Sequence, residues 1–221
     1  MRNAVLLPNG FVLTTDNSAG IGEKMDDVVS TPDEIVSYFA ARVALLEQWA
    51  SSATPLSIVV HNFSGYQSWD KYVTGIEKLF NEIGVKCPEI TGSSETNIET
   101  LQSAIAVTML GEQQEEGFNE FRWYAYGKPS VGEEVVKDED KIANLKKIRE
   151  AINMGLVHRV WPVGSTGIKG ECKRLGFDGY LVDWDVEKSA GPATSVLLGV
   201  DIFKEKEAIL HFGQYFKAIS L

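Results

Sequence analysis

The sequence predicts an α/β or α+β fold, because segments typical of strands alternate with segments of helical periodicity. Of the 221 residues, 44% are hydrophobic and 24% are charged, which is the composition of an ordinary soluble globular protein. A helix start is indicated at Thr31-Pro32-Asp33-Glu34, with a threonine cap, a proline in the first turn and a glutamate three residues after the cap. A chain of this length can build one large domain or two small ones.

In the first half of the chain, strands and helices alternate. Gly10–Asp16 is rich in β-branched and aromatic residues and predicts a strand that ends in a polar loop. The helix that starts at Thr31 is expected to bury one face, formed by Ile35, Phe39, Val43, Leu46 and Trp49. Pro55–Asn62 predicts a buried strand, and Ser68 is placed to cap a helix that Gly84 ends. The stretch PEITGSSETN predicts a short strand and a polar loop, and Leu101–Leu110 a further strand.

In the second half, the acidic stretch from Gly111 to Gly117 predicts a solvated turn. Next come an aromatic strand (FRWYAY) and a loop punctuated by Gly and Pro. An amphipathic helix follows, with Ile142, Leu145, Ile148 and Ile152 on one face and Gly155 at its end. VHRVWPV predicts a strand before a glycine-rich loop, where Ser165 or Thr166 could cap a helix ending at Gly176. The remaining predicted strands are Tyr180–Val186, Ser195–Val200 and Ile209–Phe216.

Charge and composition exclude several classes of partner. The formal net charge of −10 opposes non-specific binding to nucleic acid or to anionic membranes. Cys87 and Cys172 stand far apart without metal-ligand spacing, so we expect reduced thiols. No apolar run approaches the roughly 20 residues of a membrane helix, and the N-terminus does not have the pattern of a signal peptide. We therefore expect a cytoplasmic protein.

Three polar, glycine-containing loops follow predicted strands, where α/β folds gather ligand groups. In the first, Asp16 offers an oxygen ligand suited to magnesium, and Gly20 and Gly22 would let backbone amides approach an anion. Lys24 would add a positive charge for a phosphate. This pattern is compatible with a triphosphate site. The alternative interpretation is a capped strand end with a surface lysine.

The other two loops are also candidates for ligand binding. In the second, Glu95 could join Asp16 in holding a metal, with Thr96 and Asn97 contacting phosphate or sugar; the alternative is a polar turn. In the third, Gly164-Ser165-Thr166-Gly167 opens a helix and could cradle an anion, although it is not a Walker motif. The alternative there is a capped helix whose glycines allow close packing.

Taken together and in order, five segments resemble the superfamily of aminoimidazole ribonucleotide (AIR) synthase and thiamine-monophosphate kinase. The segments TTD and GIGEK resemble STDGVGTK of AIR synthase, with three extra residues between them. SSETN before VTMLG resembles the GGET or GGDT loop and its following strand, and YGKPSVGEEV is similar to the GxPxxGxEV crossing between the two domains. VHRVWPVGSTGIKGE and SAGPATSVLLGV resemble two segments of the second domain.

The resemblance implies two domains that work with ATP and Mg²⁺. Residues 1–117 would form an ATP-binding domain that makes a homodimer through a shared β-barrel, and residues 118–221 a short domain closing over the substrate. Asp16 and Glu95 match metal-ligand positions, and Lys24 matches the basic residue of the glycine loop. Thr96 matches the threonine of the GGET loop, and Gly164–Gly167 match the phosphate or substrate loop of the second domain.

Three departures from the family pattern bear on function. Ser93 and Ser94 replace loop glycines, the helix after Thr31 lacks the aspartates of thiamine-monophosphate kinase, and the second domain is shorter than in AIR synthase. The chain looks most like AIR-synthase-related proteins proposed as α-ribazole kinases in cobalamin lower-ligand salvage. We therefore expect a kinase that phosphorylates a small nucleoside-like alcohol, with Asp16 and Lys24 in catalysis. The alternatives are an ATP-dependent ring-closing ligase and a non-catalytic ATP-binding protein.

Overall fold

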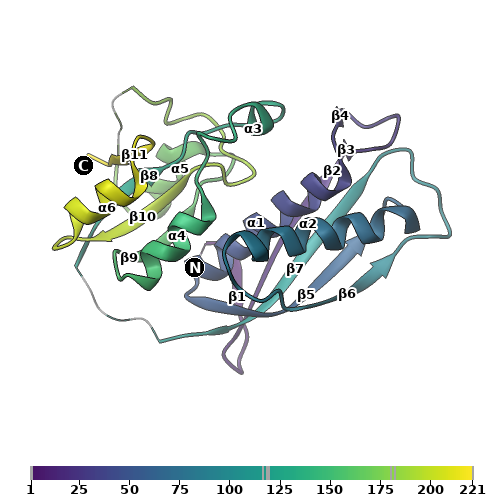
Figure 1. The fold of residues 1–221 in the computed structure, drawn as a ribbon, viewed down its shortest axis with the longest axis horizontal. Helices are drawn as coiled ribbons and strands as arrows, with labels where there is room; N and C mark the ends of the chain where they lie inside the picture. The colour runs from purple at the N-terminus through teal and green to yellow at the C-terminus, as the bar shows by residue number, and fades with distance from the viewer. Residues whose placement is uncertain (1, 116, 118–119, 180, 182, 221) are drawn as a thin grey trace. The chain divides into compact units, whose positions relative to one another are not determined.

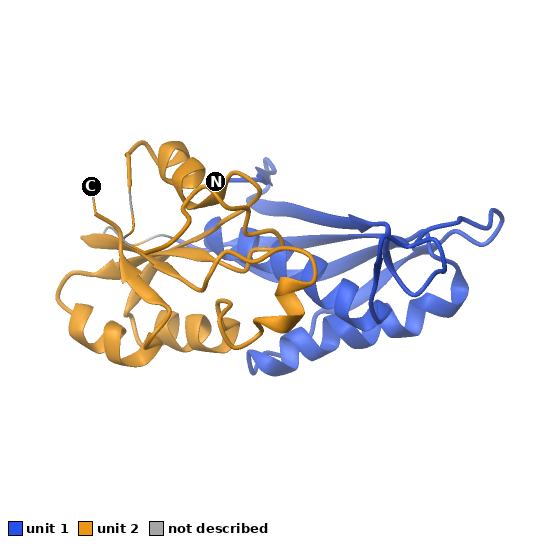
Figure 2. Ribbon diagram, turned by 90° about the horizontal axis from the view of Figure 1, so that it is seen from above, with its two compact units in different colours: residues 1–115 blue, residues 116–221 orange. Residues whose placement is uncertain are grey.

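The computed structural model describes residues 2–115, 117, 120–179, 181 and 183–220. The chain divides into two compact units, residues 1–115 and residues 116–221 (Figure 2). Each unit combines a β-sheet with helices, so the mixed α/β fold expected from the sequence is confirmed. Cys87 and Cys172 lie in different units as free thiols. Across the described ranges, no helix combines the length and the apolar character needed to cross a membrane.

The first unit contains a five-stranded sheet (Figure 1). Its spatial order is β1 (Ala4–Leu6), β2 (Phe11–Ala19), β7 (Ala104–Gln113), β5 (Ala53–Asn62) and β6 (Glu89–Ser94). β2, β5 and β6 run in one direction, and β1 and β7 run in the other. The carboxyl ends of β2, β5 and β6 therefore meet at one edge of the sheet. The short parallel pair β3 (Ile21–Gly22) and β4 (Val29–Ser30) follows β2.

Two helices cover one face of this sheet, α1 (Asp33–Ala50) and α2 (Trp69–Glu82), the latter preceded by the short 3₁₀ helix η1 (Tyr66–Ser68). Every second residue of the central strands is buried beneath α1; these residues include Val12, Ile58, Val60, Val107 and Met109. Gln48 of α1 is also buried, and its Nε2 donates to the carbonyls of Val12 and Met109 at 3.0 Å. A buried amide thus links the helix to two neighbouring strands, because its polar atoms need partners away from water.

The start of α1 differs from the prediction. Thr31 does not cap the helix: α1 begins at Asp33, and Pro32 at the cap position makes no side-chain hydrogen bond. The Thr31 amide instead donates to the Gly22 carbonyl at 2.9 Å, and the amide of Asp33 donates to the Glu23 carboxylate at 3.2 Å. The cap is therefore supplied by a side chain ten residues upstream, which local sequence rules do not consider.

The buried face of α1 is also broader than its periodicity indicates. Of the expected residues, only Leu46 is fully buried, whereas Ile35, Phe39, Val43 and Trp49 are half-buried. The fully buried set includes Val36, Ala40, Ala41, Ala44 and Leu45. The reason is that α1 packs against the sheet on one side and against α2 on another, so small residues rather than large ones lie at its closest contacts.

The second unit has a four-stranded antiparallel sheet in the order β11 (Phe216–Ala218), β8 (Phe121–Tyr126), β10 (Val196–Asp201) and β9 (Val157–Pro162). Its helices are α3 (Glu134–Lys137), α4 (Leu145–Asn153), α5 (Gly167–Arg174) and α6 (Glu205–Phe212). A core cluster joins α5 to β8 and β10 through Ala125, Ile168, Cys172 and Leu197. Partly buried aromatic side chains, including Trp123, Trp161 and Phe177, pack around it.

Three predictions in and near the second unit were wrong. Ile209–Phe216 is not a strand, because Ala208 and Phe212 of α6 are buried one helical turn apart and β11 starts only at Phe216. Of the predicted strand Tyr180–Val186, positions 180 and 182 lie outside the described residues, and residues 183–186 contain no strand. The turn expected at Gly111–Gly117 begins later than predicted, because β7 continues to Gln113.

The close packing of α1 against α2 can be tested at Gly75, a residue of α2 that lies against α1. A Cβ atom there would lie 2.1 Å from the Glu34 carbonyl oxygen and 2.2 Å from Ser37 Oγ. We expect Gly75→Ala to lower the free energy of unfolding by about 3 kcal/mol, because the helices must separate. The control, Gly84→Ala, adds a Cβ at φ +67° with no atom within 4 Å and should cost about 1 kcal/mol. Equal losses in urea unfolding would contradict close packing at Gly75.

Candidate functional site

The candidate site in the first unit lies at the edge where β2, β5 and β6 end. Two segments meet there, residues 20–31 (the glycine loop) and residues 95–103 (the Glu95 loop). The Gly20 amide donates to the Ser103 carbonyl at 2.8 Å, and the Lys24 ammonium donates to the carbonyl and the hydroxyl of Thr100 at 2.6 and 2.7 Å. The structure therefore joins the first loop that the sequence singles out to residues 100–103, which follow the second loop along the chain.

The Asp27 carboxylate makes the most extensive contact between these loops. One oxygen accepts from the Ser103 amide at 2.7 Å, and the other accepts from the Ser103 hydroxyl at 2.7 Å and from the Lys24 amide at 2.8 Å. Ser103 is only 1% exposed, so these charge-assisted hydrogen bonds are shielded from water. Sequence reasoning missed Asp27, because its partner lies 76 residues away and no local pattern connects the two.

The backbone conformation and the close packing at positions 20 and 22 of the glycine loop both favour glycine. At Gly22 the backbone has φ +157°, and a Cβ atom would lie 2.4 Å from Ser103 Oγ. Gly20 has φ +70°, and its carbonyl accepts from the amides of Val28 and Val29 at 2.8 and 3.2 Å. The glycines therefore allow the loop to turn and to lie against Ser103. Their contact with a ligand anion stays a prediction.

The Glu95 side chain hydrogen bonds to backbone amides of its own loop. Its Oε1 accepts from the amides of Asn97 and Ile98 at 2.7 and 3.1 Å, and its backbone amide donates to the Asn62 carbonyl at 2.7 Å. These backbone hydrogen bonds hold the pKa of Glu95 below its ordinary value. The neighbouring Thr96 and Asn97 are exposed, so their side chains are accessible to a ligand.

Asp16 does not lie in a loop, as its predicted position at a strand end implied, because β2 continues to Ala19. It is on the helix-covered face, near Glu47 and Arg2, which form an ion pair in which both side chains are less than a tenth exposed. Burial raises the pKa of Asp16 to about 7; the Glu47 carboxylate also raises it, while the Asn17 amide and Arg2 lower it. At neutral pH, this carboxyl group is therefore partly protonated.

Asp16 and Glu95 are not brought together within one chain. Asp16 shares a row of the sheet with Val107, Val60 and Gly92, so β6 lies three strand spacings from it, or about 14 Å. Glu95 follows β6 and lies beyond that row. Among the residues described, no group of three or more His, Cys, Asp or Glu side chains is placed to hold a metal ion.

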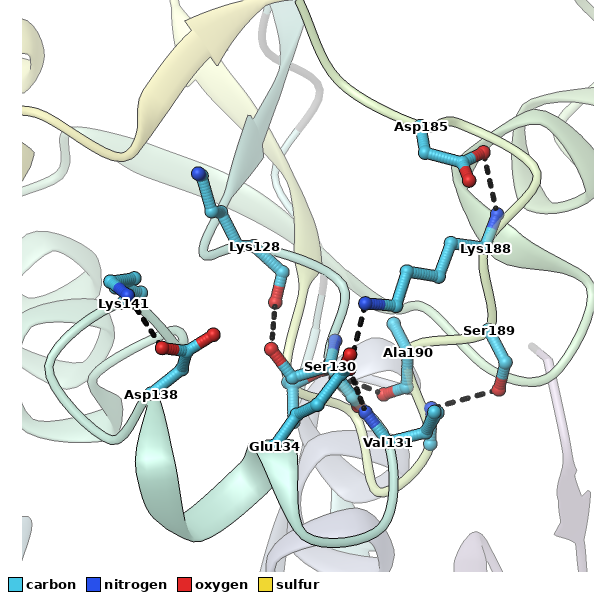
Figure 3. A network of polar contacts seen from close by, with 12 residues as sticks. Lys128, Ser130, Val131, Glu134, Asp138, Lys141, Asp185, Lys188, Ser189 and Ala190 are labelled. Atoms are coloured by element: carbon cyan, nitrogen blue, oxygen red, sulfur yellow. Dashed lines mark hydrogen bonds and ion pairs between the residues drawn. The ribbon is translucent and has the colours of Figure 1, made fainter.

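In the second unit, three segments that carry the resemblance converge. Figure 3 labels residues of two of them, between Lys128 and Glu134 and between Asp185 and Ala190. Thr194 Oγ1 accepts from the Ser130 amide at 2.9 Å and donates to the Ser130 carbonyl at 3.1 Å. The Ala190 amide donates to the Gly164 carbonyl at 3.1 Å, and the Lys188 ammonium lies 2.7 Å from the Glu134 carboxylate. Residues 128–134, 164–167 and 185–194 thus form one connected polar region.

The Gly164–Gly167 loop is more closed than the sequence predicts. Gly167 opens α5 at φ +68°, and a Cβ atom there would lie 2.6 Å from the Val186 carbonyl oxygen. The amides of Gly167, Lys169 and Gly170 already donate to protein carbonyls, at 3.2, 2.9 and 3.3 Å. Fewer donors are therefore left for an anion than the expected cradle would provide. Ser165 and Thr166 are exposed and remain the accessible groups of the loop.

Comparison with known proteins adds evidence on the fold. No family model and no curated protein matches the sequence. Among solved structures, HypE in a HypE–HypF complex is 14% identical over 99% of this chain and 86% of that chain, with a TM-score of 0.60. Thiamine monophosphate kinase from Aquifex aeolicus is 10% identical over 98% and 86%, with a TM-score of 0.61. The chain has an AIR-synthase-like fold.

This fold agrees with the expectation from the sequence motifs. T. maritima PurL, complexed with AMPPCP, matches 98% of this chain but only 42% of its own length, at 11% identity and a TM-score of 0.57. HypE in complex with ATP matches 94% of this chain and 75% of its own, at 11% identity and a TM-score of 0.56. The structural likeness establishes the shared fold. At sequence identities this low it does not establish a shared activity.

The environment of Asp16 predicts the effect of pH on stability. In the unfolded chain its carboxyl group titrates near pH 4, whereas in the folded chain it keeps its proton up to about pH 7. The folded state therefore binds more protons in this interval, and the stability contributed by Asp16 falls as the pH rises from 4 to 7. We expect Asp16→Asn to be more stable than the wild type at pH 8, by about 4 kcal/mol, and nearly equal to it at pH 4.

Urea unfolding at both pH values measures this difference. Asp26→Asn, which removes an exposed carboxylate from the glycine loop, is the matched control and should show no such dependence. A loss of stability in Asp16→Asn at pH 8 would contradict the expectation, because it would mean that the ionised carboxylate is held favourably by Arg2.

Proposed function

We propose that the protein binds ATP and transfers its γ-phosphoryl group to a hydroxyl of a small nucleoside-like alcohol, with α-ribazole as the specific candidate. The observation that carries the proposal is the junction of the glycine loop and the Glu95 loop, where Lys24 contacts Thr100 and Asp27 contacts Ser103. Thr96 and Asn97 belong to the same Glu95 loop and are exposed. The fold likeness to thiamine monophosphate kinase and to HypE in complex with ATP supports this choice.

Phosphoryl transfer depends mainly on positioning and on neutralisation of charge, so it does not need a covalent nucleophile. Bound ATP supplies the phosphoryl group. The Lys24 ammonium, held on a carbonyl and a hydroxyl of Thr100, would bind phosphate oxygens, and the exposed Thr96 and Asn97 would contact phosphate or ribose. In the second unit, the exposed hydroxyls of Ser165 and Thr166 would bind the acceptor.

The two residues predicted to bind magnesium, Asp16 and Glu95, are poorly placed to hold one ion together. Asp16 and Glu95 lie too far apart to share an ion within one chain, and Glu95 already accepts two backbone hydrogen bonds. We therefore assign no step of the proposed transfer to these two residues acting on one metal ion.

We further propose that the first unit forms a homodimer through the sheet face opposite α1 and α2. Both helices lie on one side of the sheet (Figure 1). On the other face, Val5 and Leu13 are paired across β1 and β2 and are 57% and 37% exposed. Further along this face, the hydroxyls of Thr15 and Thr108 hydrogen bond to each other at 3.2 Å. An apolar and hydroxyl-bearing sheet surface of this kind is suited to a second sheet.

The nucleotide assignment is tested at Lys24. We expect Lys24→Met to weaken ATP binding about tenfold, because a cation next to phosphate oxygens contributes about 1–2 kcal/mol. The matched control is Lys86→Met, which removes one positive charge just before β6, at the opposite sheet edge. Isothermal titration calorimetry measures both variants. Equal affinities would show that the nucleotide, if bound, does not contact the glycine loop.

Product analysis tests the reaction. We expect incubation with Mg·ATP and a panel of nucleosides and coenzyme precursors, α-ribazole included, to leave the phosphoryl group on one acceptor. A second candidate, an ATP-dependent ring-closing ligase, rests on the resemblance of the sequence motifs to AIR synthase. It would consume an amide-bearing ribonucleotide and release ADP and free phosphate. A third outcome, ATP binding without turnover of any compound, would indicate a non-catalytic nucleotide-binding protein.

The proposed dimer is tested at Leu13. We expect the wild type to be dimeric and Leu13→Asp to be monomeric in light scattering after size-exclusion chromatography, because burying an unpaired carboxylate between two sheets is costly. The control is Leu210→Asp on α6, where the side chain is 85% exposed and the same change should leave the mass unaltered. A wild-type monomer, or a dimer that persists in Leu13→Asp, would contradict an interface on this face.

A further inference from the structure

Glu23 connects the glycine loop to the first residues of two helices. Its Oε1 accepts from the amide of Asp33, the first residue of α1, at 3.2 Å. Its Oε2 forms an ion pair with the ammonium of Lys71, in the first turn of α2. The hydrogen bond from Lys71, followed by the one from the Asp33 amide, lowers the pKa of Glu23. One carboxylate therefore contacts both helices that cover the sheet.

This contact provides a cap that α1 otherwise lacks. Pro32 occupies the cap position and makes no side-chain hydrogen bond there, and the first amides of a helix need acceptors from outside it. A carboxylate is favoured at this position because the helix dipole is positive at its N-terminus. The conformation of the glycine loop and the start of α1 are thus linked through a single side chain.

Asp33 strengthens the link to α2. Its side chain is 2% exposed, and its Oδ1 has no hydrogen-bond partner among the described residues. Burial raises the pKa of Asp33, and a hydrogen bond with Ser68, at the cap position of α2, opposes the rise. Glu23 and Asp33 both act electrostatically on the same ammonium, that of Lys71. The Lys71 ammonium is therefore attracted both by a carboxylate of the glycine loop and by one in the first turn of α1.

The position of Glu23 within the loop gives this linkage a consequence for the site. Gly22, on one side of it, lies against Ser103, and Lys24, on the other side, reaches Thr100. The loop is thus fixed to the Glu95 loop at residues 22 and 24 and to the helices at residue 23. Asp27 and Gly20 also contact Ser103 of the Glu95 loop. Losing the Glu23 contacts therefore removes the restraint on the helix side of the loop and leaves the restraint on the side of the Glu95 loop.

We infer that Glu23 is a positioning residue: it holds the glycine loop in the conformation that presents Lys24 to the phosphates of the nucleotide. Glu23 itself touches neither the phosphates nor the acceptor. The functional part of this inference rests on the proposed ATP binding. The structural part, that the Glu23–Lys71 pair restrains residues 20–31, stands independently of any ligand.

Hydrogen exchange followed by mass spectrometry tests the restraint without a nucleotide. Glu23→Gln keeps an acceptor for the Asp33 amide but loses the charge that pairs with Lys71, and Lys71→Met removes the cation. We expect both variants to raise the exchange rate of amides in residues 20–31 about three- to fivefold, as for the loss of a half-exposed ion pair, and Lys71→Arg to keep the wild-type rate. The control is Lys169→Met, which breaks the exposed Lys169–Glu187 pair of the second unit and should leave residues 20–31 unchanged.

Calorimetry with Mg·ATP then tests the link to function. The same two variants should weaken ATP binding about three- to fivefold, while Lys71→Arg and Lys169→Met retain the wild-type affinity. Unchanged exchange in Glu23→Gln and Lys71→Met would overturn the inference, as would faster exchange in Lys71→Met alone. If exchange rises as expected but the wild type binds no ATP, the proposed function fails and the restraint by Glu23 stands.

Discussion

The candidate site depends on the hydrogen bonds between the Asp27 carboxylate and Ser103, because they fix the glycine loop to the last residue of the Glu95 loop, directly before β7. Ionic hydrogen bonds of this kind contribute about 1.5–3 kcal/mol each when they are shielded from solvent, and Ser103 is almost completely buried. Their geometry also requires a residue without a side chain at position 22, because a Cβ atom would overlap Ser103. One carboxylate thus determines both the position of the loop and part of its sequence.

The positive charges near this junction locally oppose the negative electrostatic potential that the net charge of the protein produces. A net charge of −10 opposes the approach of any anionic ligand, so an ATP site on this chain must rely on local groups. Lys24 and Lys71 lie at the edge where α1 and α2 begin, and the positive ends of both helix dipoles lie there too. The Lys71 ammonium pairs with the Glu23 carboxylate, and the Lys24 ammonium donates to the carbonyl and hydroxyl of Thr100, so both ammonium groups are oriented before a ligand arrives. Pre-organised charges of this kind favour binding because less reorganisation is needed.

Local sequence rules predicted the elements whose causes are local. The strand predicted at Pro55–Asn62 and the helix ended by Gly84 both appear, because an apolar run and a glycine at positive φ act within a few residues. The burial expected along that strand is wrong, because only alternate residues such as Ile58 and Val60 are buried and Leu56 is exposed. The rules failed where the cause is distant. The cap of α1 comes from Glu23 rather than from Thr31, and Asp27 finds its partner 76 residues away. Asp16 was expected at a strand end, yet its pairing with Val107 keeps it inside β2.

Ser93 and Ser94, which stand where the GGET motif that this segment resembles has glycines, are accommodated by the sheet. Both serines lie in β6, paired with His61 and Asn62 of β5, where an extended backbone accepts any side chain. Ser94 Oγ accepts from Asn62 Nδ2 at 2.9 Å, and the same amide group donates to the Gly65 carbonyl at 2.7 Å. A serine therefore stabilises the segment that leads from β5 into η1 and α2. Because the replacements sit before the loop rather than within it, the accessible groups of the Glu95 loop keep their position at the sheet edge.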